Sequence, residues 1–461
     1  MVRIIPLSFG EHMNKLLTAS LLTSLLVAFP VNANVDTTVN TTTANTPAKP
    51  MANKPIANKP IPGKALAKKA PLIIPAVPQL DVASYMLMDS GSGDILGQQN
   101  ADERLEPASL TKMMTAYVVD RAVASGKISL DQMVPVSEKA WRMEGSRMFI
   151  NVNTEVSVRE LLKGVIIQSG NDASVALAEF VAGSEEGFSQ LMNEEASRLG
   201  MTNSHFVNAT GLPAANHYSS AHDLAILGRA LVQDFPESYP FYAEKEFTYN
   251  NIKQSNRNLL LWRDNSVDGI KTGFTDAAGY CLVSSAQRDG MRLIAVIMGS
   301  KSTKARAEQS SQLLTYGFRF YETRELYAAN AIISSPRVWM GEKKEVNLGL
   351  ADNLYLTIPR GQYDNIQATV KLNDVIKAPV GENESYGNLV LTLDGKTLVD
   401  KPLIALENVP KGSWWNNASD YVKLSFNKFW NKEEAEAEAE NATNPTAAEK
   451  TASAETNIAK D

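Results

Sequence analysis

Residues 109–124 carry apolar side chains on almost every side of a helical projection, and no other segment constrains the fold as strongly. The apolar residues of this segment are Met113, Met114, Ala116, Tyr117, Val118, Val119, Ala122 and Val123. A helix of this kind must be buried on most of its surface. The 461 residues, 44% hydrophobic and 21% charged, supply enough apolar material for such a core and for about two or three domains.

The segments around this helix predict an α/β domain over residues 78–327. A strand is expected at 84–88, followed by helical patterns whose ranges are 157–167, 171–182 and 221–233. Two apolar β runs come late, at 279–286 and 291–299, before a helix near 304–322. Strands at both ends of a helical middle imply one sheet, flanked by helices, that is built from distant parts of the chain.

Residues 328–412 predict a small all-β domain. Short alternating segments at 354–358 and 389–393 are typical of strands, and Asp394-Gly395 after the second favours a hairpin turn. This part of the sequence contains no cluster of catalytic side chains that we could find.

Residues 413–432 predict an amphipathic helix. Its apolar residues fall within about half of the helix circumference; they are Trp414, Trp415, Ala418, Tyr421, Val422, Phe426, Phe429 and Trp430. Three tryptophans, with Lys423 and Lys428 towards the edges of the apolar face, favour the surface of an anionic membrane. The alternative is a helix docked on the protein itself. The acidic segment 433–461 is expected to be a disordered tail.

The N-terminal region predicts export. Residues 1–33 read as a signal peptide, with an apolar stretch at 16–29 behind Arg3 and Lys15 and a small residue, Ala33, at the end. Met13 is an alternative start, and an uncleaved anchor is the alternative to cleavage. Residues 34–77 form a Pro- and Lys-rich spacer of low complexity.

The charge distribution gives no reason to expect a nucleic-acid partner. The formal net charge is −6, and the tail at 433–461 accounts for all of it, because it holds eight of the 51 acidic residues and two of the 45 basic ones. The lone Cys281 excludes an intramolecular disulfide, so an exported chain must be stabilised by packing. Its apolar surroundings favour a small buried side chain over a reactive thiol.

Ser109 and Lys112 form the first catalytic motif, Ser-x-x-Lys, at the start of the buried helix. A spacing of three places both side chains on one face, a turn apart. A buried lysine near a helix N-terminus and a second cation loses basicity and can accept the serine proton. The pattern alone is weak, because Ser425 and Lys428 repeat it.

Two further motifs follow in the chain. Ser169-Gly170-Asn171 begins a helix and offers a hydroxyl and an amide, although a simple helix cap would look the same. Lys271-Thr272-Gly273 supplies a cation and a hydroxyl suited to a carboxylate, and its glycine permits close approach of a strand to a ligand.

The three motifs in this order are those of penicillin-binding proteins and class A β-lactamases. Over about residues 78–430 the chain resembles the low-molecular-mass penicillin-binding proteins that act as serine D-alanyl-D-alanine carboxypeptidases. The resemblance implies a β-lactamase/transpeptidase-like fold, the stem pentapeptide of peptidoglycan as substrate, and β-lactams as covalent inhibitors. It also implies a β-domain stalk, and a C-terminal helix that holds the enzyme on the periplasmic face of the cytoplasmic membrane.

The resemblance also implies roles for individual residues. Ser109 would form the acyl-enzyme after Lys112 removes its proton, and Ser169 with Lys271 would return that proton to the departing D-alanine. Asn171 would lie near the acyl side chain. The backbone N–H groups of Ser109 and Phe274 would bind the oxyanion. The remaining substrate-binding residues, placed around the terminal carboxylate or beside it, would be Thr272, Gly273, Thr275, Arg257 and Arg306.

The sequence leaves some alternatives open. Relatives usually carry histidine where this chain has Phe274, so the substrate preference or the deacylation step could differ. A D,D-endopeptidase shares the three motifs. So does a serine β-lactamase, but no Glu-x-x-Leu-Asn surrounds Glu194 and Glu195. A catalytically silent scaffold is disfavoured by the intact motifs. No cofactor or metal is expected, since the chain contains no His-Glu-x-x-His.

Overall fold

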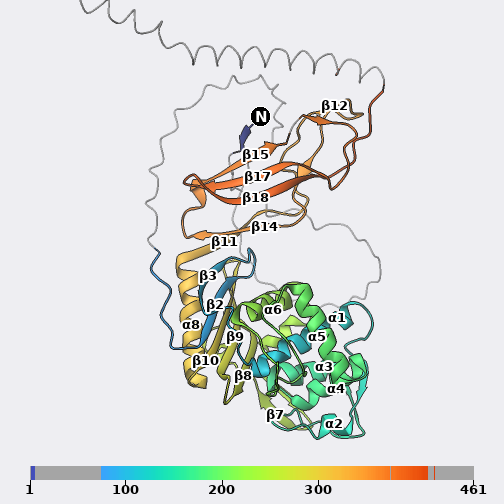
Figure 1. The fold of residues 1–461 in the computed structure, drawn as a ribbon, viewed down its shortest axis with the longest axis vertical. Helices are drawn as coiled ribbons and strands as arrows, with labels where there is room; N and C mark the ends of the chain where they lie inside the picture. The colour runs from blue at the N-terminus through green and yellow to red at the C-terminus, as the bar shows by residue number, and fades with distance from the viewer. Residues whose placement is uncertain (1, 6–73, 374, 414–419, 421–461) are drawn as a thin grey trace, which may run out of the picture. The chain divides into compact units, whose positions relative to one another are not determined.

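The structure is a computed structural model that describes residues 2–5, 74–373, 375–413 and 420 (Figure 1). Its central feature is a five-stranded antiparallel sheet. The strands lie in the order β3 (Ile95–Gln99), β2 (Ser84–Asp89), β10 (Met291–Ser300), β9 (Gly279–Arg288) and β8 (Val267–Thr275). The sheet therefore combines strands from both ends of the domain, as the sequence predicts.

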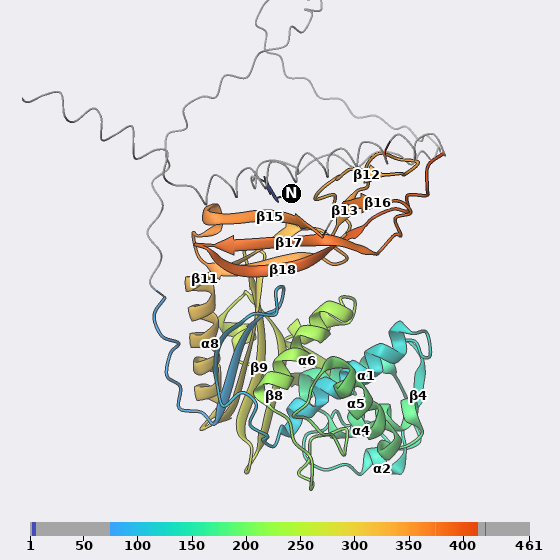
Figure 2. The same ribbon diagram turned by 45° about the horizontal axis from the view of Figure 1, so that its top comes forward.

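Helices cover both faces of this sheet (Figures 1 and 2). One face carries α8 (Thr303–Phe320), and the other carries the helical part of the domain. That part contains α1 (Thr111–Ala124), α2 (Glu138–Trp141), α3 (Val158–Lys163), α4 (Asn171–Ala182), α5 (Glu185–Leu199) and α6 (Ala221–Asp234). Short elements complete the domain: the 3-10 turns η1 (Ala108–Leu110) and η3 (Tyr239–Ala243), the π-helical turn η2 (Gly164–Gln168), α7 (Leu260–Arg263), and the hairpins β4 (Met133–Pro135) with β5 (Glu155–Ser157) and β6 (Glu246–Tyr249) with β7 (Ile252–Ser255).

The two faces of the sheet belong to two separate hydrophobic clusters. Along β10, Ile294 and Val296 pack into the cluster around α1, whereas Leu293 and Ala295 pack into the cluster beneath α8. Successive side chains of a strand point to opposite faces, so a strand that is covered on both sides reads as an unbroken apolar run. This explains the long apolar segments that predicted β9 and β10.

Helix α1 lies at the centre of the larger cluster, and eleven of its fourteen residues are buried. The prediction that this helix is enclosed on most sides is confirmed. The helix itself begins at Thr111, because the chain first makes the 3-10 turn η1 that contains Ser109. The predicted helix at 157–167 is divided into α3 and the π-helical turn η2.

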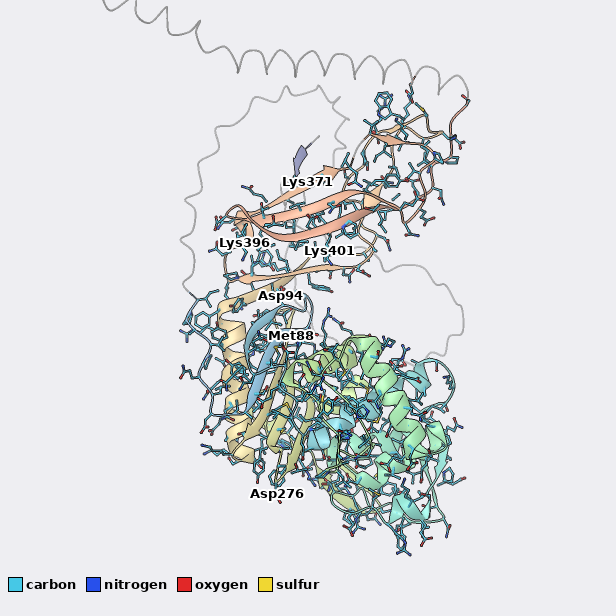
Figure 3. All side chains as sticks on the ribbon, in the orientation of Figure 1. Met88, Asp94, Asp276, Lys371, Lys396 and Lys401 are labelled. Carbon is cyan, nitrogen blue, oxygen red and sulfur yellow. The ribbon has the colours of Figure 1, made fainter. Side chains whose placement is uncertain are left out.

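The C-terminal part is rich in β structure, as expected. One sheet has the order β1 (Val2–Ile5), β15 (Ile366–Leu372), β17 (Ser385–Leu393), β18 (Lys396–Ala405) and β13 (Leu348–Gly349). Figure 3 labels Lys371, Lys396 and Lys401 on these strands. Two smaller pairs join β11 (Tyr321–Tyr327) to β14 (Leu354–Pro359) and β12 (Val338–Trp339) to β16 (Ile376–Lys377), and η4 (Tyr363–Asn365) precedes β15. The predicted turn between β17 and β18 has positive φ at both Asp394 and Gly395, which suits a two-residue hairpin.

Several predicted segments lie largely outside the described residues. Of the predicted leader, only Val2–Ile5 are described, and they pair with β15. The spacer is described from residue 74 onward, the amphipathic segment only at Ser413 and Asp420, and the acidic tail not at all. Among the described residues, no helix has the length and apolar character needed to cross a membrane.

Candidate active site

Ser109 lies where the edge strand of the sheet meets the start of the buried helix. It is partly buried in η1, directly before α1. Strand β8 passes so close to this turn that a Cβ on Gly273 would lie 3.1 Å from the carbonyl oxygen of Pro107 and 3.3 Å from the Cβ of Ala108. The glycine of the third motif therefore allows the strand to approach the serine, as the sequence suggests.

Lys112 points back towards Ser109 from the first turn of α1. Its Nζ lies 3.3 Å from the Ser109 Oγ, 2.7 Å from the Asn171 Oδ1 and 2.5 Å from the carbonyl oxygen of Thr210. The side chain is only 1% exposed. The Lys112 amine therefore contacts Ser109 of the first motif and Asn171 of the second, and its third neighbour is the backbone carbonyl of Thr210.

The surroundings of Lys112 weaken its hold on a proton. Burial, and to a smaller extent the nearby positive charge of Arg257, together lower the pKa of Lys112 to about 7, although the carboxylate of Asp172 acts in the opposite direction. A large share of the Lys112 side chains is therefore neutral near neutral pH. A neutral amine at hydrogen-bond distance from a hydroxyl can accept its proton.

Ser169 and Asn171 lie on the other side of this amine. Ser169 ends the π-helical turn η2 in the left-handed conformation with φ of 67°, and its buried Oγ has no hydrogen-bond partner among the described residues. Asn171 begins α4, and its amide is engaged on both sides, because Nδ2 donates to the carbonyl oxygen of Glu144 at 2.6 Å and Oδ1 accepts from Lys112. The amide of Asn171 thus orients the lysine and keeps one N–H and one lone pair of Oδ1 for a further partner.

The second lysine, Lys271, comes from β8 and is also buried. Its Nζ donates to the carbonyl oxygen of Thr272 at 3.1 Å. Burial holds the pKa of Lys271 well below its usual range, and the charges of Lys112, Arg257 and Arg306 act in the same direction. Four basic side chains therefore share one small region.

A pocket of about 440 Å³ opens over these residues. Its lining includes seven of the eleven residues predicted from the sequence, namely Ser109, Ser169, Arg257, Thr272, Gly273, Phe274 and Arg306. The two lysines and Asn171 lie behind this wall. Thr275 lies elsewhere, because its hydroxyl bonds to Glu106 at 3.3 Å and accepts from the backbone N–H of Ala278 at 3.0 Å. Figure 3 labels Asp276, the next residue in the turn between β8 and β9.

The two arginines of the pocket differ in their contacts. Arg306 reaches in from α8, and its Nη1 donates to the carbonyl oxygens of Gly273 at 2.8 Å and Cys281 at 3.2 Å. Arg257 is exposed and makes no hydrogen bond or ion pair within the part of the chain that the structure describes. Cys281 is fully buried and free, as predicted.

Phe274 forms one rim of the pocket. Its side chain is 49% exposed, and its ring packs on that of Tyr280 with the centroids 4.3 Å apart. The Arg306 guanidinium lies 5.6 Å from the centroid of the same tyrosine ring. An aromatic pair, with the Arg306 guanidinium beside it, therefore forms this rim of the pocket.

Sequence reasoning missed several residues that hold this site in place. The Asp172 carboxylate accepts hydrogen bonds from the backbone N–H groups of Met148, Phe149 and Ile150 at 2.8–3.2 Å. An aspartate near the start of a helix is common, so the sequence does not predict these contacts. The carbonyl oxygen of Thr210 contacts Lys112 through the backbone alone. Tyr280, Ser146 and Thr303 also line the pocket without belonging to a motif.

Comparison with known proteins shows the family of the chain. A family model for D-alanyl-D-alanine carboxypeptidase matches residues 72–302, and a model for the penicillin-binding protein 5 C-terminal domain matches residues 321–411. D-alanyl-D-alanine carboxypeptidase DacA of Escherichia coli K12 is 46% identical over 367 residues, which are 78% of this chain and 91% of that protein.

Solved structures agree as well. The crystal structure of penicillin-binding protein 5 from Haemophilus influenzae is 44% identical, with a TM-score of 0.70, over 73% of this chain and 99% of that one. Penicillin-binding protein 6B from Escherichia coli is 37% identical, with a TM-score of 0.61, over 72% of this chain and 97% of that one. The chain therefore belongs to the D-alanyl-D-alanine carboxypeptidase family.

Proposed function

We propose that this carboxypeptidase removes the terminal D-alanine from peptidoglycan stem pentapeptides through an ester on Ser109. The observation that carries the proposal is the buried Lys112 Nζ, 3.3 Å from the Ser109 Oγ, with its pKa lowered to about 7. The neutral amine takes the hydroxyl proton as Oγ attacks the carbonyl of the penultimate D-alanine. The peptide C–N bond then breaks, the terminal D-alanine leaves with a proton, and water hydrolyses the ester in a second step.

The other motif residues have supporting roles in this proposal. The free hydroxyl of Ser169 relays the proton towards the leaving amine, with Lys271 beside it. The backbone N–H groups of Ser109 and Phe274 bind the oxyanion of the tetrahedral intermediate. Arg257 and Thr272 face the pocket and receive the terminal carboxylate of the substrate.

Acylation by a fluorescent penicillin tests the nucleophile. We expect the wild-type protein to be labelled and Ser109→Ala to remain unlabelled, with Ser425→Ala as the matched control because it removes the serine of the second Ser-x-x-Lys pattern. Two of the similar solved proteins are named as penicillin-binding proteins, which supports acylation by β-lactams. A wild-type protein that is not labelled would contradict the proposal.

The substrate is tested by product analysis. Purified protein is incubated with a stem pentapeptide, a cross-linked peptide dimer and benzylpenicillin in separate reactions. We expect D-alanine to be released from the pentapeptide faster than the dimer is cut, with slow penicillin turnover. Faster cleavage of the dimer would indicate an endopeptidase, and rapid penicillin hydrolysis would indicate a β-lactamase.

We also propose that residues 413–432 hold the enzyme on the anionic outer face of the cytoplasmic membrane. The carboxylate of Asp420 accepts hydrogen bonds from Arg337 and from the backbone N–H of Met340, both at 3.0 Å. In the predicted helix Asp420 lies opposite the apolar side. Its contacts with the β domain therefore involve the predicted polar side, which supports the proposal that the predicted apolar side binds lipid.

Truncation tests the membrane proposal. Removing 413–461 should release the protein from sedimented membranes without loss of activity on soluble peptides, whereas removing only the tail at 433–461 should not. If the shorter protein still sediments with membranes, the segment before residue 78 is the anchor.

The same proposal divides the chain into a signal peptide (1–33), a spacer (34–77), a catalytic domain (78–327), a β-domain stalk (328–412), the membrane helix (413–432) and the tail (433–461).

A further inference from the structure

Arg306 is a buried cation whose contacts in the pocket are made to backbone carbonyls. Its side chain is 5% exposed, and Nη1 donates to the carbonyl oxygens of Gly273 and Cys281. These two residues are register partners on β8 and β9. The arginine of α8 therefore joins the two strands beside Ser109, and the atom that makes these contacts is already occupied before any substrate arrives.

The Gly273 carbonyl belongs to the same peptide group as the Phe274 N–H. A trans peptide group is planar, so its C=O and N–H point in opposite directions. The carbonyl is held on the side of β9, where Arg306 also contacts Cys281. Strand β8 is the edge of the sheet, and η1 lies against its open side. The Phe274 N–H consequently points towards the turn that carries Ser109.

We propose that Arg306 is a positioning residue that fixes and polarises the Gly273–Phe274 peptide group, so that the Phe274 N–H is aimed at the oxyanion. This inference rests on the proposed roles of Ser109 and the Phe274 N–H. A cation on a carbonyl oxygen makes a stronger hydrogen bond than a neutral donor, and it draws electron density from the peptide group, which strengthens the N–H as a donor. An oxyanion donor is effective only when it is held in place before the charge develops.

The contacts of the two arginines suggest a division of labour between them. Arg257 is exposed to the pocket and has no protein partner in the described part of the chain, so it is available for the substrate carboxylate. Arg306 is buried, bound to two carbonyls and partly screened by the ring of Tyr280. The role of Arg306 inferred here therefore differs from the carboxylate contact that the family resemblance implies.

Two thiolester substrates distinguish the proposed positioning role of Arg306 from carboxylate binding by Arg257. One joins N-acyl-D-alanine to thioglycolate and carries a carboxylate on the leaving group, and the other has that carboxylate amidated. Thiol release is followed with a chromogenic disulfide, and the only cysteine of the protein, Cys281, is buried. Rates are expressed per acylatable site, counted by end-point labelling with fluorescent penicillin. Acylation is resolved into the dissociation constant of the ester and the rate constant of the acylation step.

The variants are Arg306→Lys, Arg306→Met and Arg257→Gln. We expect both Arg306 variants to lower the acylation rate constant of the two esters by the same factor, roughly tenfold to a hundredfold, with Lys the milder change. The dissociation constants should stay unchanged. Arg257→Gln should instead lower the ratio of the acylation rate of the carboxylate ester to the acylation rate of the amidated ester. This ratio is internal to each variant and does not depend on the fraction of folded protein.

Ser310→Ala is the matched control for packing, because it removes another buried contact between α8 and β9, the 2.5 Å hydrogen bond between Ser310 and Ser284. The rate constant per site should not change in this variant. The inference would be overturned by an Arg306 effect confined to the carboxylate ester, by weaker ester binding with an unchanged rate constant, or by an equal loss in Ser310→Ala. Failure of the proposed function is a separate result, since the wild-type protein would then not be acylated.

Discussion

The pH dependence of acylation is the sharpest consequence of the Lys112 environment. The pKa of Lys112 falls from 10.5 to about 7, chiefly through burial. A lysine of ordinary pKa would be neutral in only about one molecule in 3000 at pH 7, whereas this lysine is neutral in about half of them. The neutral amine is thus available roughly a thousandfold more often in Lys112 than in an exposed lysine at the same pH.

The assay is the second-order rate of labelling by fluorescent penicillin between about pH 5 and about pH 9. We expect the rate to rise with pH, with a midpoint near 7, and then to level off, because only the neutral amine accepts a proton. Lys112→Arg keeps a cationic donor at this position but cannot act as a base, so the rate should fall by about 10²–10⁴ and the rise should disappear.

Lys271 is the control, because it is a second buried lysine with a lowered pKa. Lys271→Arg replaces this weakened base with a permanent positive charge beside the pocket, so its labelling rate should be lower but should still rise with pH. The reasoning would be refuted by a wild-type rate that is flat across this range, or by a midpoint near 10. It would also be refuted if the rise survived in Lys112→Arg and vanished in Lys271→Arg.

Three other substitutions, one of them with a matched control, probe the residues that support the fold around α1 and the site. Asp172→Asn weakens three charged hydrogen bonds and should destabilise the fold by about 1.5–3 kcal/mol in urea unfolding. The same change should move the midpoint of the acylation pH profile to lower pH, because the Asp172 carboxylate raises the pKa of Lys112. An unchanged midpoint would contradict this. Gly211→Ala should cost at least about 1 kcal/mol and slow labelling, since φ is +80° and the new Cβ would overlap the carbonyl oxygen of Ala108. Gly126→Ala, with φ of +73° and open space, is its control and should leave labelling unchanged. Burial raises the pKa of Asp120 from 3.8 to about 7, so this carboxyl stabilises the fold below about pH 4 and loses that contribution as the pH rises through 7. Asp120→Asn should therefore flatten this pH dependence and raise the unfolding free energy at pH 8 by up to roughly 4 kcal/mol, and equal stability of the two proteins at pH 8 would refute it.

The parts of the fold that the sequence predicted well are those with strong apolar patterns. Residues 109–124 and the late β runs at 279–286 and 291–299 are buried on both sides, and this leaves a continuous apolar signature. Helix α5 (Glu185–Leu199) was not predicted. Its residues are mostly polar, and the buried ones, Phe188, Ser189, Met192 and Ala196, form a narrow stripe at helical spacing that the prediction overlooked.

In the site, the positions of the motif side chains could be predicted from the sequence, whereas the contacts made by backbone atoms could not. Ser109, Ser169 and the segment Lys271–Gly273 are distant in the chain and adjacent in space, as their order predicted. The contacts made by backbone atoms left no trace in the sequence. Any residue at position 210 or 273 could supply the backbone carbonyl that contacts Lys112 or Arg306. The glycine at position 273 is explained by the close approach of β8 to η1, and not by the hydrogen bond to Arg306. A motif therefore identifies the reacting groups but not the peptide groups that hold them.

In the proposed mechanism, the two lysines would let one site both bind an anion and deprotonate a serine. A carboxylate in the pocket is best received by a charged lysine, whereas proton transfer from Ser109 needs a neutral one. Lys112 and Lys271 are both buried, and a positive charge on Lys112 lowers the pKa of Lys271. Because such coupling is reciprocal, a charge on Lys271 also favours the neutral form of Lys112. An arriving carboxylate beside Lys271 favours the proton there, and that charge helps to keep Lys112 neutral. In the proposed mechanism, the substrate carboxylate would thus place the two lysines in different protonation states.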